Sequence, residues 1–112
     1  VLTVEVAEHL DIGYQSMARL LAAARRPDAV FCTSDLIAYG AQRRCAEAGL
    51  VAGRDMHFAG FDDGPLNEWI APWLNAVRVP YAEYGAAIVR ALRRETDDIV
   101  LAHQLVVRDL QR

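Results

Sequence analysis

Two short polar clusters follow two apolar runs in the middle of the chain. Residues 33–35, Thr-Ser-Asp, come directly after the run AVFC at 29–32, and Asp62 and Asp63 come after the run 56–61. A helical pattern separates the clusters, as in a strand-helix-strand unit. Because consecutive parallel strands deliver their carboxyl ends to one edge of a sheet, we expect the two clusters to lie side by side. Hydroxyl and carboxylate groups gathered there predict a binding site for a small polar molecule.

The acidic pair admits more than one interpretation. Strand alternation sends one carboxylate of Asp62 and Asp63 into the crevice and the other away from it. A carboxylate that accepts a hydrogen bond from a ligand hydroxyl or amine contributes about 1.5–3 kcal/mol. Alternatively, both acids only cap a turn over 65–70. A metal-binding pair or a phosphoacceptor would need further partners, such as a lysine, and the chain contains no lysine.

Other polar candidates have a structural alternative as well. Ser34 is a predicted helix N-cap, and a cap can coexist with ligand contact, because a helix N-terminus offers free N–H groups. Glu8 and His9 end the first predicted strand and reach the same edge, or lie in a solvated loop. Tyr81 follows a strand and a proline, and belongs either to the core or to the wall of the pocket.

These side chains require an alternating frame of strands and helices. The sequence predicts a strand over 1–6, a helix capped by Asp11, a buried inner strand over 29–32, and a helix from Ser34 to a left-handed stop at Gly49. Further predicted elements are strands over 56–61, 76–79 and 103–109, a short helix or turn over 65–70, and a helix after Pro80 with a buried stripe of Tyr81, Tyr84, Ile88, Ala91 and Leu92. This order predicts an α/β fold of three layers, a mostly parallel sheet with helices on both faces.

The composition of the chain excludes several classes of function. The 112 residues carry a net charge of −3 without a basic face, so these residues alone should not grip DNA. The three histidines are far apart, which gives no support to a metal site, and the two cysteines lack CxxC spacing and are expected to pack as free thiols. No bilayer-spanning run, signal peptide, cofactor motif or catalytic motif is found. Binding is therefore favoured over turnover.

Two groups of residues are typical of association surfaces. Trp69 and Trp73 flank an Ile-Ala-Pro turn and act either as lids on the core or as an exposed contact patch. Tyr39, Gln42 and Arg43 share a helix face away from the apolar stripe, and Tyr and Arg are enriched in interfaces. A plain solvated helix face is the alternative for this second group.

An ordered series of motifs carries a family resemblance over nearly all of the chain. It comprises Pro-Asp-Ala at 27–29, Ser-Asp at 34–35, Ala-x-Gly-Ala, a Gly-Leu helix end, Gly-Phe-Asp-Asp at 60–63, a Pro-x-Leu motif, a Pro/Gln turn, here Pro80, and a closing Leu-Val-Val-Arg. In this order the chain resembles the C-terminal half of the ligand-binding core of LacI/GalR-family transcriptional repressors.

The resemblance implies a periplasmic-binding-protein-like type I fold, in which an effector binds between two lobes and the cores form a homodimer. Residues 1–112 would then be the C-terminal lobe of the effector-binding and dimerisation core, without the helix-turn-helix domain that contacts operator DNA and without most of the N-terminal lobe. By position in the family motifs, the effector-binding candidates are Asp62, Ser34, Glu8, Tyr81 and Val79. The implied dimer face consists of Tyr39, Gln42, Arg43, Trp69 and Ile70.

The chain departs from the family pattern at two of these positions. Ser34 is shorter than the usual Asn, and Glu8 replaces an aromatic ring with a charge, so no particular sugar is carried over. The leading hypothesis is a cytoplasmic repressor that senses a small polar, sugar-like ligand. The runner-up is a periplasmic sugar-binding protein of a transporter or chemoreceptor, and an α/β enzyme is a distant third.

Overall fold

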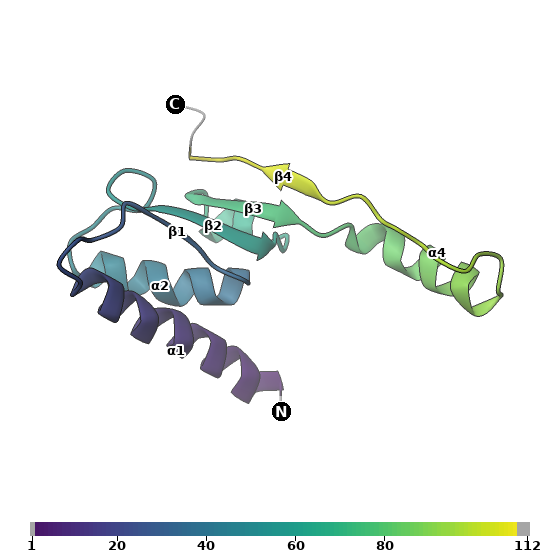
Figure 1. Cartoon of the computed structure of the whole chain (residues 1–112), viewed down its shortest axis with the longest axis horizontal. Helices are drawn as coiled ribbons and strands as arrows, with labels where there is room; N and C mark the ends of the chain where they lie inside the picture. Colours follow the sequence, from purple (N-terminus) through teal and green to yellow (C-terminus); the bar gives the residue numbers. More distant parts are fainter. Residues whose placement is uncertain (1, 110–112) are drawn as a thin grey trace.

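The computed structural model describes the backbone of residues 2–109 and the side chains of residues 7–109 (Figure 1). Helices and strands alternate along the whole of this range. Their order is α1 (Leu2–Leu21), β1 (Ala29–Phe31), α2 (Asp35–Glu47), β2 (His57–Asp62), α3 (Asn67–Ile70), β3 (Leu74–Arg78), α4 (Tyr81–Leu92) and β4 (Gln104–Val106).

The strands form one sheet in the order β1-β2-β3-β4. The pairs β1–β2 and β2–β3 are parallel, with Phe31 opposite Ala59 and Asp62 opposite Arg78. The mostly parallel sheet predicted from the sequence is thus confirmed. β4 runs antiparallel to β3 and is shorter than the strand predicted over 103–109.

α1 and α2 pack on each other and cover one face of the sheet (Figure 1). They cross at Gly13 and Gly40, where a Cβ atom on either residue would overlap a backbone carbonyl of the other helix. The buried core lies between these helices and the strands, and its large members include Met17, Met56, Phe58 and Leu74. Cys32 and Cys45 are buried free thiols within it, as predicted.

The strand predicted over 1–6 is wrong. Val1 lies outside the described residues, and helix α1 already runs from Leu2. Asp11 is consequently an exposed residue inside the helix and not its N-cap. An alternation over only six residues is compatible with a strand or with a helix. The residues before Gly13 include no Gly or Pro that would interrupt a helix, and the later turns of α1 pack on α2, so the segment continues this helix.

β1 is an edge strand, so the prediction of a buried inner strand over 29–32 is also wrong. Phe31 is 64% exposed, and only Cys32, just after the strand, is buried. Wholly apolar composition favours burial on both faces, but among the described residues β1 pairs along one side with β2 only.

Helix α4 extends away from the sheet (Figure 1). It contains no buried residue, so the predicted buried stripe is wrong for the described chain. Tyr81, Tyr84 and Ile88 are exposed, although the apolar periodicity itself is helical as predicted. Periodicity indicates which face of a helix is apolar, and an apolar face becomes buried only where another element covers it.

Candidate functional site

The two polar clusters meet at the carboxyl edge of the sheet. Ser34 caps α2, as predicted, by accepting a hydrogen bond from the backbone N–H of Ile37 at 3.3 Å. Its neighbour Asp35 accepts a hydrogen bond from the backbone N–H of Gly64 at 3.0 Å through Oδ2. This bond ties the start of α2 to the turn that follows β2, so the two strand tips lie side by side.

Asp62 ends β2 in an unusual backbone conformation. Its φ is 118°, and its carbonyl oxygen accepts a hydrogen bond from the N–H of Val79 at 3.1 Å. The side chain is half-buried. Partial burial and the nearby negative charge of Asp62 raise the pKa of the Tyr81 hydroxyl. Asp62, Val79 and Tyr81 therefore belong to one neighbourhood.

Asp63 points into the protein and has a structural role. Its side chain is fully buried and forms ion pairs at 2.8 Å with both Arg78 and Arg108. Asn67 donates a further hydrogen bond to Oδ1 at 3.0 Å. Burial by itself would raise the pKa of Asp63, but the hydrogen bonds from Arg108, Asn67 and Arg78 outweigh it and hold the pKa below its ordinary value.

Asp35 is the second buried acid at this edge. Its Oδ2 accepts hydrogen bonds from Gly64 and Asn67, whereas Oδ1 lies against Gly60 and has no partner among the described residues. Burial raises the pKa of the Asp35 carboxyl above its ordinary value, and the nearby charges of Asp62 and Asp63 add to the rise.

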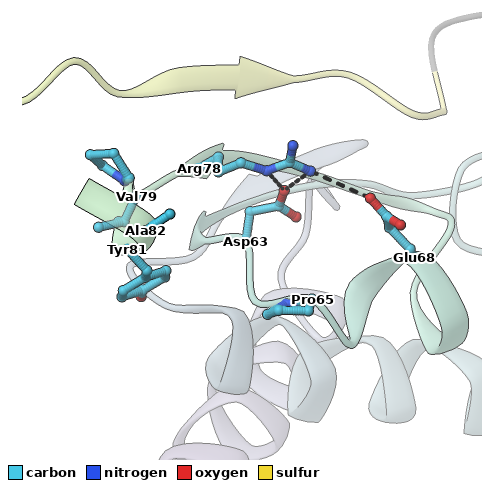
Figure 2. Close-up of a pocket in the computed structure, with 8 residues that line it drawn as sticks. Asp63, Pro65, Glu68, Arg78, Val79, Tyr81 and Ala82 are labelled. Carbon is cyan, nitrogen blue, oxygen red and sulfur yellow. Dashed lines mark hydrogen bonds and ion pairs between the residues drawn. The ribbon is translucent and has the colours of Figure 1, made fainter. Parts of the chain in front are cut away.

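A cavity of about 330 Å³ opens between the ends of β2 and β3 (Figure 2). Residues 78–82 form one wall, and Asp63, Pro65 and Glu68 form the other. Figure 2 shows the guanidinium group of Arg78 between the carboxylates of Asp63 and Glu68, the latter at 3.6 Å. Hydrogen-bonding groups and apolar walls suit a bound polar molecule.

The structure does not bring every effector-binding candidate to this edge. Asp62, Val79 and Tyr81 lie together at the end of β2, and Val79 and Tyr81 also line the cavity. Ser34 caps α2 after the neighbouring strand β1, and neither Ser34 nor Asp62 is among the residues that line the cavity. Glu8 is an exposed residue of helix α1 and not the end of a strand, so its predicted position at a strand tip is wrong.

The association candidates fall on two surfaces. Trp69 and Ile70 of α3 are 85% and 53% exposed, respectively. Tyr39 and Arg43 line a groove of about 460 Å³ between α1 and α2, and Gln42 is half-buried on the same helix. The sequence left two roles open for Trp73, a lid on the core or part of an exposed contact patch. The structure shows the lid, because the ring of Trp73 packs edge-on against Phe58 with 5.1 Å between the ring centroids.

Three residues of this edge escaped the sequence analysis: Arg78, Arg108 and Asn67. For two of them the sequence does contain a recognisable pattern. Arg78 and Arg108 each interrupt an apolar stretch, AVRV and LVVRD, and an arginine in such a place calls for an acidic partner. Asn67 had no such signal, because its hydrogen bonds reach residues on two other segments of the chain, α2 and the turn after β2.

Among the side chains of residues 7–109, no group of three or more His, Cys, Asp or Glu is arranged to hold a metal ion. No helix in the described part of the chain has both the length and the apolar character needed to cross a membrane.

Known proteins share this architecture. The ribose operon repressor of Haemophilus influenzae is 37% identical over 89 residues, which are 78% of this chain and 27% of the repressor. The crystal structure of a LacI-family regulatory protein from Chloroflexus aggregans superimposes with a TM-score of 0.76 and 31% identity, covering 88% of this chain and 38% of that one. A LacI-family regulator from Enterococcus faecium with bound ribose gives a TM-score of 0.71 at 27% identity, covering 86% and 38%.

The order of the elements and the mostly parallel sheet are those of a periplasmic-binding-protein-like domain. Residues 2–110 match the family model of the periplasmic binding protein-like domain. The chain belongs to this family and, within it, to the LacI-family transcriptional regulators. It spans about a quarter of the length of the ribose operon repressor, namely 27%.

Proposed function

We propose that this chain is the C-terminal lobe of the effector-binding core of a LacI-family transcriptional repressor. The observation that carries the proposal is the meeting of the Ser34 cap and the Asp62 turn at one sheet edge, beside the walls formed by Val79 and Tyr81. A carboxylate acceptor, a hydroxyl group and free helix N–H groups suit a small polyhydroxylated molecule.

The proposed effector is a sugar. Support comes from the ribose bound to the Enterococcus faecium regulator, which shares the fold at 27% identity. Asp62 is the proposed anchor for ligand hydroxyl groups, because among the described residues it has no ion pair, whereas Asp63 is already occupied by two arginines. The site binds its ligand without turnover in this proposal.

The full protein would act as a homodimer in the cytoplasm. Operator DNA would be held by a separate helix-turn-helix domain, since these 112 residues carry a net charge of −3. Effector binding would change lobe closure, and the energy for that change is the difference in effector affinity between the two states. The solute-carrier alternative is not favoured, because the relatives are transcriptional regulators.

A thermal-shift screen of sugars and nucleosides against the intact protein tests the proposal. A ligand at about 100 times its Kd stabilises the folded protein by about 2.7 kcal/mol. We expect at least one sugar to raise the melting temperature, and Asp62→Ala to abolish the rise while leaving the unliganded Tm close to that of the wild type.

A matched control is Asp97→Ala, which removes an exposed carboxylate beyond α4. This variant should respond to the sugar like the wild type. A ligand response that survives in Asp62→Ala would remove the assignment of Asp62 as the anchor.

A further inference from the structure

Asn67 joins three parts of the molecule by hydrogen bonds. It is the first residue of α3, and it is completely buried. Its Nδ2 donates to Asp35 Oδ2 at 2.9 Å and to Asp63 Oδ1 at 3.0 Å, and its Oδ1 accepts a hydrogen bond from the hydroxyl of Tyr39. The side chain thereby connects α2, the turn after β2, and α3.

The turn that Asn67 holds is strained. Asp62 and Asp63 have φ values of 118° and 52°, a region that favours glycine. Such residues cost energy and persist only where surrounding contacts hold them. Asp63 supplies those contacts through Arg78, Arg108 and Asn67, and so fixes the backbone that presents Asp62.

The same side chain fixes the exposed surface of α3. This helix is a single turn that begins five residues after Asp62, and it carries Trp69 and Ile70, 85% and 53% exposed. The backbone of Asn67 also closes the segment, because its N–H donates to Gly64 and its carbonyl oxygen accepts from Ala71. A shift of α3 against the turn would break hydrogen bonds that are buried and without solvent to replace them.

We propose that Asn67 is a positioning residue that couples the turn presenting Asp62 to the association surface of α3. A change in the conformation of residue 62 then alters subunit association through Trp69 and Ile70. The inference rests on the proposed function, since it takes Asp62 as the ligand anchor and α3 as part of the dimer face.

A double-mutant cycle on the intact protein tests this coupling without any ligand. Asp62→Gly removes the carboxylate and relieves the positive φ, so it perturbs the turn directly. The dimer dissociation constant is measured by analytical ultracentrifugation for the wild type, Asp62→Gly, Asn67→Leu and the double variant. We expect Asp62→Gly to change this constant at least about fivefold in the wild-type background and less than about twofold beside Asn67→Leu, because allosteric couplings are typically about 5–150-fold.

Asn75→Leu is the matched control background. Asn75 is the other asparagine of the chain and is likewise buried, and its side chain bonds to Phe58, Asp109 and the backbone N–H of Arg108 but makes no direct bond to Asp62, Asp63 or α3. Beside Asn75→Leu, the effect of Asp62→Gly should equal that in the wild type. Where Asn67→Leu fails to fold, Asn67→Ser replaces it, with the same loss of coupling expected.

The outcomes separate the two proposals. An Asp62→Gly effect that persists unchanged beside either Asn67 variant, or that is absent from a dimeric wild type, overturns the coupling and leaves the proposed function intact. A wild type that remains monomeric contradicts the dimer of the proposed function, and the coupling with it. Loss of the effect beside both Asn67→Leu and Asn75→Leu shows general destabilisation and also overturns the role of Asn67.

Discussion

Asp62 and Asp63 are neighbours with different surroundings. Asp63 is buried between Arg78 and Arg108, whereas Asp62 is half-buried beside Tyr81. Strand alternation predicts that the two side chains diverge, but not which one turns inward. That choice depends on arginines 15 and 45 positions away in sequence, which short-range patterns do not connect to the pair.

Replacement of Asp63 should destabilise the protein strongly. Asp63→Asn leaves two partly buried arginines, Arg78 and Arg108, without the negative charge that they share. Loss of one partner of a buried ion pair costs about 3–5 kcal/mol. Urea unfolding of the intact protein at pH 7 measures the change. Asp62→Asn is the matched control and should lower the free energy of unfolding by less than about 1 kcal/mol, in line with a partly exposed site.

Acid should remove the contribution of Asp63 in the wild type. Its pKa is lowered in the folded protein, so its stabilisation is complete above the ordinary carboxyl pKa of about 3.9 and is lost as the pH falls through the lower folded value. Asp63→Asn should therefore show a shallower loss of stability below about pH 4. Parallel pH curves for the two proteins would contradict the ion-pair account.

Asp35 should have the opposite pH dependence. Its pKa is raised by burial, so the folded state holds a proton that the unfolded state releases, and stability falls as the pH rises from the ordinary value through the raised one. Asp35→Asn cannot titrate, and one amide oxygen can still accept from Gly64 and Asn67. The stability of this variant relative to the wild type, from urea midpoints at pH 4 and pH 7, should increase with pH; a constant difference would refute the burial argument.

At the scale of elements, the α1–α2 contact depends on two glycines. A Cβ at Gly13 or Gly40 would overlap the carbonyl oxygen of Ile37 or Leu10, both part of helix backbone that cannot rotate away. Gly13→Ala should therefore destabilise the protein by about 1–3 kcal/mol, the usual cost of overpacking. Thermal unfolding of the intact protein checks this prediction.

Gly85→Ala gives the control for that experiment. Gly85 is also helical, in α4, and an added Cβ would meet nothing within 4 Å. Here the higher helix propensity of alanine should stabilise the protein by up to about 1 kcal/mol. Equal destabilisation by both substitutions would mean that α1 and α2 do not approach as closely as described.

Local signals predicted the elements around the site better than those at the chain's ends. The Ser34 cap and the left-handed Gly49, with φ of 79°, bracket α2 as the sequence predicts. Apolar patterns also located β2 and β3 to within about two residues. The strand predicted over 1–6 failed because a six-residue alternation is too short to exclude a helix.

The burial of α4 failed for a different reason. An amphipathic pattern predicts a helix with an apolar face, and α4 has both properties, yet none of its residues is buried. The covering partner of an apolar face is a tertiary property, and no local pattern contains it. The same holds for Asn67, whose partners lie on two other elements.

At the scale of the whole molecule, the chain consists of a packed body and a helix that projects from it. The sheet with α1 and α2 forms a packed body, and α4 extends from it to give a length of 54 Å against a thickness of 26 Å (Figure 1). The returning segment is fastened to the body, because Asp109 bonds to His57 at 2.8 Å and to Asn75. The polar strand tips lie between the body and α4, where β3 leads into the helix.

Association of subunits should depend on the exposed face of α3. Trp69→Glu places a charge where an 85% exposed indole stands, and burying that charge in an interface is unfavourable. The dimer association constant, measured by sedimentation of the intact protein, should fall at least about tenfold, which is equivalent to about 1.4 kcal/mol.

Val100→Glu provides the comparison, since Val100 is 93% exposed and lies beyond α4. This variant should leave the dimer fraction unchanged. An unaltered dimer in Trp69→Glu would exclude α3 from the proposed interface.

The position of a bound sugar in a crystal structure of the intact protein tests the central claim most directly. We expect the ligand from the thermal-shift screen at the strand tips, with one of its hydroxyl groups about 2.5–3.0 Å from a carboxylate oxygen of Asp62 and the Ser34 end of α2 facing it. A sugar bound instead in the groove between α1 and α2, with Asp62 free of contact, would contradict the account.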